Sequence, residues 1–129
     1  MRLMHTMLRV ADLDASIRFY QAVLGMQVLR RIDFSEGRFS LVYLGYGPES
    51  EQAAIELTWN WDKQDYTHGN YYGHIAIESD DIKGLCKQAS ELAYRVSRKP
   101  GPMKQSSAII AFIEDPDGHQ IELIQQGSL

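Results

Sequence analysis

The chain has 129 residues, 44% of them hydrophobic and 23% charged, with a formal net charge of −4. This size and composition suit one globular domain with its own core, and scattered cationic residues in an acidic chain disfavour nucleic-acid binding. No apolar run approaches the roughly 20 residues of a membrane span or forms a signal peptide, and Cys86 has no second cysteine to pair with. We therefore expect a cytoplasmic protein.

The first half of the chain predicts a strand, a helix and further strands. Residues 3–10 are apolar and strand-like, and two good helix N-cap residues follow, Asp12 and Asp14. Apolar residues then recur at helical spacing, at Ile17, Tyr20 and Leu24, until Gly25 supplies a stop signal. Residues 39–45 and 53–59 are typical of strands separated by a turn rich in Gly and Pro.

The second half repeats this order. Isoleucines alternate after His74 and indicate a strand, and Asp80 or Asp81 can cap a helix with an apolar face. Residues 107–115 and 119–125 are predicted to form a hairpin around a Pro-Asp-Gly turn.

The two halves resemble each other, which indicates an internal duplication. Residues 4–26 resemble residues 73–96, and AIELT resembles the later QIELI. The predicted fold is α+β: two tandem βαβββ modules forming a curved mixed sheet, in a single domain. The modules span roughly residues 1–62 and 72–129.

Two histidines and two glutamates occupy equivalent places in the repeat. His5 and His74 are 69 residues apart in the first strand of each half, and Glu56 and Glu122 are 66 apart in the last strand. A lone strand His is more often a hydrogen-bonded core residue, and an outward-facing Glu is simply solvated. Their equivalence favours convergence on a divalent first-row metal, which binds imidazole and carboxylate groups.

Strand alternation places further polar residues beside these candidates. Arg9 shares a strand face with His5, and Asn60 shares one with Glu56. An Arg suits a substrate carboxylate and an Asn suits an amide, although either alone is also compatible with a solvated surface.

Other reactive residues have simpler interpretations. His119 follows a turn and is expected to be exposed, and His68 lies in a predicted loop. Cys86 falls on an apolar helix face, as a buried structural thiol would. Trp59 and Trp61 are expected to pack in the core or at an interface.

Four segments carry a family resemblance: residues 1–26, AIELTWNW, YGHIAIESDD and IAFIEDPDGHQIELI. Together they resemble glyoxalase I (lactoylglutathione lyase) of the vicinal oxygen chelate superfamily, in its short bacterial form. The resemblance covers essentially the whole chain.

This resemblance implies a metal held by His5, Glu56, His74 and Glu122, with nickel favoured, cobalt second and zinc less favoured. It implies isomerisation of the methylglyoxal–glutathione hemithioacetal to S-lactoylglutathione through a metal-bound enediolate, a detoxification of methylglyoxal. Glu122 is the candidate base. Glu56 is a ligand, or the base for the adduct of opposite configuration.

The resemblance also implies a binding site for glutathione. Arg9 and Asn60 would bind it, a loop near residues 101–104 would close over it, and Lys104 would contact a carboxylate. Longer family members place an Arg, which helps to hold a glutathione carboxylate, where this chain has Asn70. A thiol related to glutathione is therefore an alternative substrate component. The resemblance further implies a homodimer whose sites are shared between subunits.

Alternatives on the same scaffold are a methylmalonyl-CoA epimerase, a thiol transferase, an extradiol dioxygenase and a non-catalytic small-molecule binding protein. The dioxygenase needs two His and one carboxylate, with position 56 not a ligand. A non-catalytic binding protein is expected to lack some of the metal ligands, whereas all four candidate ligands are present here.

Overall fold

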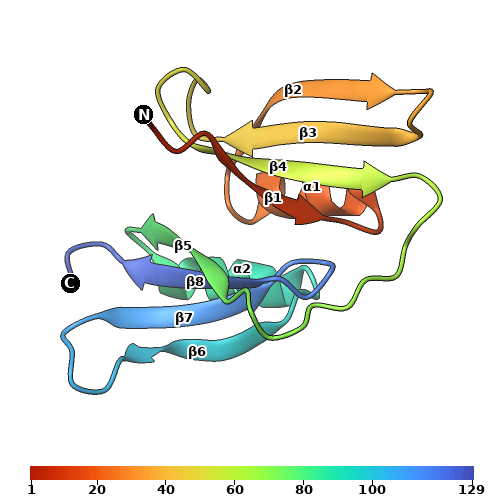
Figure 1. The fold of residues 1–129 in the computed structure, drawn as a ribbon. Coiled ribbons are helices and arrows are strands. Elements are labelled where there is room, and N and C mark those ends of the chain that lie inside the picture. Colours follow the sequence, from red (N-terminus) through yellow and green to blue (C-terminus); the bar gives the residue numbers. More distant parts are fainter. The chain divides into compact units, whose positions relative to one another are not determined.

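The computed structural model describes residues 1–129 as two compact units, residues 1–67 and 68–129 (Figure 1). Each unit contains one helix and one four-stranded sheet. This layout confirms the predicted pair of βαβββ modules.

In the first unit the element order is β1 (His5–Arg9), α1 (Leu13–Ala22), β2 (Gln27–Phe34), β3 (Phe39–Gly45) and β4 (Ala54–Asn60). The sheet order is β1-β4-β3-β2, with β1 parallel to β4 and the other pairs antiparallel. Phe19 and Tyr20 of α1 are fully buried, as are Val42 and Leu57 of the sheet. Along β1, Leu8 is buried and its neighbours Met7 and Arg9 are exposed, so the two faces of this strand differ in burial.

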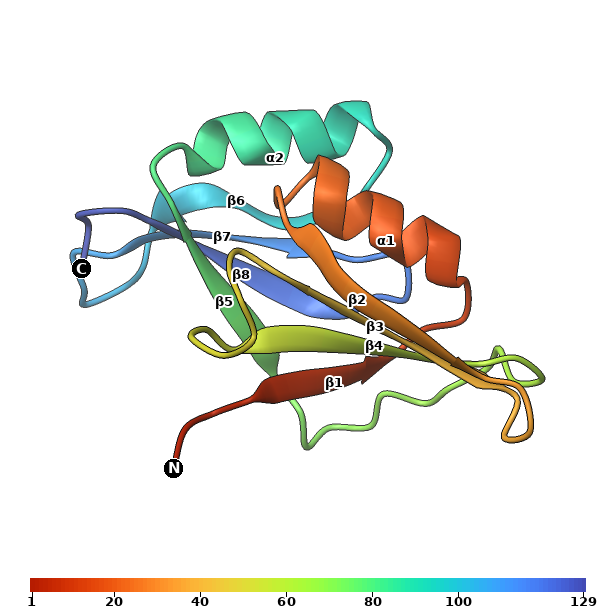
Figure 2. The same cartoon turned by 90° about the horizontal axis from the view of Figure 1, so that it is seen from above.

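The second unit repeats this topology with β5 (His74–Ser79), α2 (Ile82–Glu91), β6 (Val96–Pro102), β7 (Ile109–Glu114) and β8 (Gln120–Gln125). The sheet order is β5-β8-β7-β6, again with its edge strand parallel to the last strand. Ile82 and Ala89 of α2 are buried, as are Ile121 and Leu123 of β8. Figure 2 shows the same elements from above.

Both helices begin at an aspartate. Asp12 accepts the amide of Ala15 at 3.0 Å, and Asp81 accepts the amide of Gly84 at 2.9 Å. Of the candidate caps, Asp12 and Asp81 are therefore the ones used. Both helices have ten residues, and neither is long and apolar enough to cross a membrane.

The chain leaves the two helices in the same left-handed conformation. Gly25 has a φ of 67° after α1, as its stop signal predicted, but Ala93 has a φ of 66° after α2. The amide of Ala93 donates to the Ser90 carbonyl at 3.0 Å, and that of Tyr94 to the Ala89 carbonyl at 2.9 Å. These bonds satisfy carbonyls at the helix end, so Ala93 adopts a conformation that favours glycine.

One expected loop is shorter than predicted. Gly101 and Pro102 form the end of β6 and pair with Ile110 and Ile109 of β7. Proline is tolerated there because β6 is an edge strand. The turn begins only at Met103.

Candidate functional site

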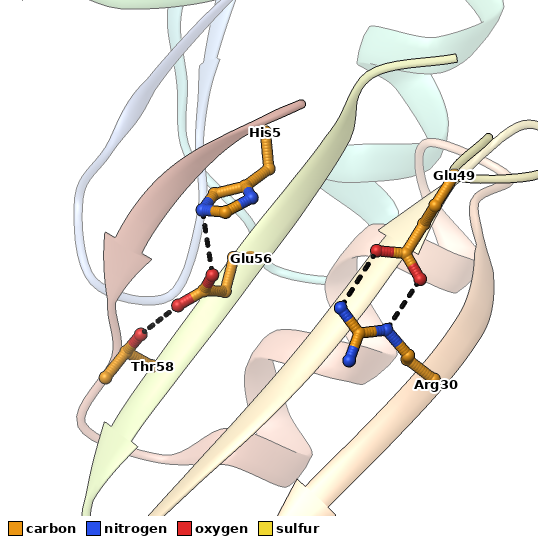
Figure 3. Close-up of polar contacts among 5 residues, drawn as sticks. All are labelled: His5, Arg30, Glu49, Glu56 and Thr58. Atoms are coloured by element: carbon orange, nitrogen blue, oxygen red, sulfur yellow. Dashed lines mark hydrogen bonds and ion pairs between the residues drawn. The ribbon is translucent and has the colours of Figure 1, made fainter. Parts of the chain in front are cut away.

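The first unit brings His5 and Glu56 together. β1 and β4 are neighbouring parallel strands in which Met7 pairs with Glu56, so His5 lies one side-chain repeat from the carboxylate. The Nε2 atom of His5 is 2.9 Å from Oε2 of Glu56 (Figure 3), and the two side chains are 36% and 11% exposed. The other carboxylate oxygen, Oε1, accepts a hydrogen bond from the Thr58 hydroxyl at 3.0 Å.

The second unit builds the same pair from equivalent strands. Ala76 of β5 pairs with Glu122 of β8, and Nε2 of His74 is 3.0 Å from Oε2 of Glu122. These side chains are 42% and 16% exposed. The His–Glu pair therefore occupies the same strand register in both units.

An aromatic residue supports each histidine from the third strand of its sheet. The ring of His5 meets Tyr43 edge-on at 5.7 Å between centroids, and His74 meets Phe112 in the same way at 5.2 Å. Tyr43 pairs with Glu56 across the strands, and Phe112 pairs with Glu122 in the other sheet. These contacts restrict the orientation of each imidazole.

A charged cluster lies next to the first pair. Nε and Nη2 of Arg30 bind the Glu49 carboxylate at 2.7 and 3.2 Å (Figure 3), and the guanidinium lies 3.9 Å above the Tyr43 ring. The hydrogen bond from Arg30 lowers the pKa of Glu49. Burial, followed by hydrogen bonding and charge interaction with Glu56, raises the pKa of Tyr43, so its phenol stays protonated near neutral pH.

Sequence reasoning missed Arg30, although the repeat carried a signal for it. Arg30 pairs with Tyr43 on β3, and Arg98 pairs with Phe112 on β7. The two arginines are 68 residues apart, close to the separation of the histidines. Their guanidiniums have different partners, since Nη2 of Arg98 donates to the Pro102 carbonyl at 3.1 Å.

Two of the three expected substrate-binding residues lie on strands, and the third lies in a turn. Arg9 is exposed and pairs with Thr58, on the face of β1 that carries His5. Asn60 lies two residues beyond Thr58 on β4 and donates to the Tyr66 hydroxyl at 2.9 Å. Lys104 is exposed in the turn after β6.

Another group of polar side chains lies at the turn between β7 and β8. Oδ1 of the buried Asp115 accepts the amides of Asp117 and His119, both at 2.9 Å, and Oδ2 is 2.8 Å from Nδ1 of His119. The expectation that His119 is exposed is wrong: its side chain is 11% exposed because the Asp115 carboxylate holds it inward. Nε2 of His68 is also 2.8 Å from the Asp117 carbonyl oxygen.

The charge state of this cluster follows from its contacts. Burial lowers the pKa of His119, but its hydrogen bond to Asp115 and the charges of Asp115 and Asp117 outweigh burial and raise the pKa overall. Asp115, Asp117 and His119 each offer one potential metal-ligand atom, and these three atoms lie within 4.8 Å of one another. The Asp115 oxygens are already engaged by the turn, so we interpret the cluster as a device that shapes the hairpin.

The two His–Glu pairs fit a divalent metal better. Each pair presents an imidazole nitrogen and a carboxylate oxygen side by side on a sheet, and its side chains keep partial solvent access. Nitrogen and oxygen donors of this kind suit nickel, cobalt and zinc.

Comparison with known proteins gives the family. The sequence model of the Glyoxalase/Bleomycin resistance protein/Dioxygenase superfamily matches residues 2–123. The chain belongs to this superfamily. A lactoylglutathione lyase of Neisseria meningitidis serogroup A is 53% identical over 128 residues, which cover 99% of this chain and 93% of that protein. The resemblance to glyoxalase I is confirmed.

Solved structures agree with this assignment. Glyoxalase I of Zea mays matches with a TM-score of 0.93 and 40% identity over 97% of this chain. This chain spans only 44% of the maize chain. The trypanothione-dependent glyoxalase I of Leishmania major matches with a TM-score of 0.88 and 42% identity, covering 98% of this chain and 87% of that one.

Proposed function

We propose that this protein is a metal-dependent lactoylglutathione lyase that isomerises the methylglyoxal–glutathione hemithioacetal to S-lactoylglutathione, and so detoxifies methylglyoxal. The observation that carries the proposal is the His–Glu pair built at the same strand register in both units. Relatives that share about half of this sequence across nearly its whole length are named for that activity.

The proposed ligands are His5, Glu56, His74 and Glu122. A divalent ion bound by them would supply a Lewis acid that polarises the two neighbouring oxygens of the adduct. Glu122 is the proposed base. Its carboxylate takes the proton from C1, the carbon that carries the hydroxyl and the sulfur, and the electron pair left behind delocalises into the neighbouring carbonyl at C2. The same carboxylate returns the proton to C2 while the hydroxyl proton moves between the oxygens, so the product is an isomer and no redox partner is needed.

Arg9, Asn60 and Lys104 are the proposed contacts for the thiol part of the substrate. Arg9 suits a carboxylate because its guanidinium presents a planar fork of donors. Asn70 replaces the arginine of longer members, and the Leishmania relative is named for trypanothione, so the thiol specificity needs its own measurement. Competing glutathione and trypanothione adducts in one assay would rank them directly.

Nickel is the proposed metal, because two imidazoles and two carboxylates would leave open positions on an ion that prefers six ligands, and the substrate oxygens could take them. Nickel and cobalt readily take six ligands, whereas zinc tolerates lower coordination. At equal occupancy, the nickel enzyme should turn over much faster than the zinc enzyme.

The proposed assembly is a homodimer in the cytoplasm, with His5 and Glu56 of each site from one chain and His74 and Glu122 from the other. Mixing a His5→Ala chain with a Glu122→Ala chain tests this assembly. With subunit exchange verified, a shared site restores activity in the heterodimer, and a site within one chain restores none.

The decisive test of function starts from metal-free protein. Nickel, cobalt, manganese or zinc is added back and the methylglyoxal–glutathione adduct is assayed. We expect S-lactoylglutathione to form only after metal addition. Turnover of a CoA thioester or a catechol instead would favour the epimerase or dioxygenase, and metal-independent ligand binding without turnover would favour a binding protein.

A further inference from the structure

The two candidate carboxylates occupy equivalent positions but have different neighbours. Both oxygens of Glu56 are engaged: Oε2 lies 2.9 Å from Nε2 of His5, and Oε1 accepts the Thr58 hydroxyl at 3.0 Å (Figure 3). Thr58 is 9% exposed, so water competes little for this bond. Tyr43 pairs with Glu56 across the strands, and its ring meets His5 edge-on.

The second unit has no side-chain hydroxyl at either matching position. Ile124 follows Glu122 by two residues, as Thr58 follows Glu56, and Phe112 pairs with Glu122 where Tyr43 pairs with Glu56. Neither side chain can donate a hydrogen bond. Oε2 of Glu122 lies 3.0 Å from His74, which leaves Oε1 without the hydroxyl that its counterpart has.

We propose that Thr58 is a positioning residue that restricts Glu56 to metal ligation, and that Ile124 at the matching position leaves Glu122 with an uncommitted oxygen that can accept the substrate proton. This inference rests on the proposed function. It assigns different roles to two glutamates that the duplication made equivalent, and it names the residues that separate them.

The physical reason is competition for the same carboxylate oxygen. A base must present a lone pair to the substrate C–H, and a buried hydroxyl that already donates to that oxygen has to be displaced first. A ligand gains from the same bond, because an outer hydrogen bond fixes its orientation toward the metal. Thr58 therefore supports ligation by Glu56 and opposes its use as a base.

The first test replaces Thr58 by valine, which keeps the shape and removes the hydroxyl. With nickel competed against a chelator, we expect the apparent affinity to fall about 10–100-fold, as for other outer partners of metal ligands. Thr58→Ser should stay near wild type. Thr6→Val makes the same chemical change in β1 on the face opposite His5 and should leave affinity unaltered.

The second test adds the missing donor with Ile124→Thr. We expect kcat to fall at least tenfold with KM little changed and nickel affinity no weaker than in wild type, because the new hydroxyl occupies the oxygen that takes the proton. Circular dichroism and thermal unfolding verify that each variant folds.

Two outcomes would overturn the inference: nickel affinity of Thr58→Val within twofold of wild type, or an undiminished kcat in Ile124→Thr. The affinity arm needs no turnover. A wild-type protein that binds nickel but does not convert the adduct would therefore refute the proposed function separately, while the Thr58 comparison still decides the positioning role.

Discussion

Replacing Asp115 by alanine should strongly destabilise the second unit. The side chain is fully buried, its Oδ1 accepts two backbone amides at 2.9 Å, and its Oδ2 is 2.8 Å from Nδ1 of His119. Alanine leaves all three groups without this acceptor in a site that water reaches poorly. Loss of one partner from a buried charged pair costs about 3–5 kcal/mol, a large part of the roughly 5–15 kcal/mol that stabilises a typical domain.

The matched control is Asp62→Ala. Asp62 binds Arg38 through two contacts at 2.6 and 2.7 Å, shorter than any made by Asp115, but the two side chains are 65% and 58% exposed. Exposed ion pairs stabilise a protein by about 0–1 kcal/mol. Asp115→Ala should therefore lose more stability than Asp62→Ala, because burial matters more than contact distance. Urea denaturation of both variants at pH 7 measures the two losses. Equal losses, or a loss below 1 kcal/mol for Asp115→Ala, would refute this reasoning.

Two further predictions concern the second unit. Ala93→Gly should raise the free energy of unfolding by about 0.5–1 kcal/mol, because glycine relieves a φ of 66° at some cost in unfolded-state entropy; urea denaturation that shows destabilisation would contradict this. Because the pKa of His119 is raised in the folded state, its stabilising contribution is complete below its ordinary pKa of about 6.5 and is lost as pH rises through the folded-state pKa. The unfolding free energy should therefore fall more between pH 6 and pH 8 in wild type than in His119→Gln. An equal fall in both proteins would show that His119 does not cause the pH dependence.

The sequence predicted that His5 and His74 lie in the first strand of each half and Glu56 and Glu122 in the last, because the repeat displays this order twice. The pairing of each His with the Glu of its own unit depends on those two strands being neighbours, which the sequence does not display. Burial of His119 could not be predicted, since it depends on one acceptor, Asp115, inside a turn that also reads as solvent-exposed.

Strands β2 and β6 were not predicted individually. Both are edge strands with register shifts and largely exposed side chains, so neither has a clear apolar alternation. Arg30 was missed for a similar reason: its role depends on contacts with Tyr43 on β3 and with Glu49 in the turn between β3 and β4.

The most direct test of the central claim is the metal content of four purified proteins after equal nickel loading and dialysis. Wild type and His119→Gln should retain equal nickel, because the Asp115 cluster is interpreted as structural, whereas His5→Ala and His74→Ala should each lose most of it. Elemental analysis reads this result without any assay of activity. Nickel retained by His5→Ala and His74→Ala but lost from His119→Gln would contradict the account and place the metal at the turn between β7 and β8.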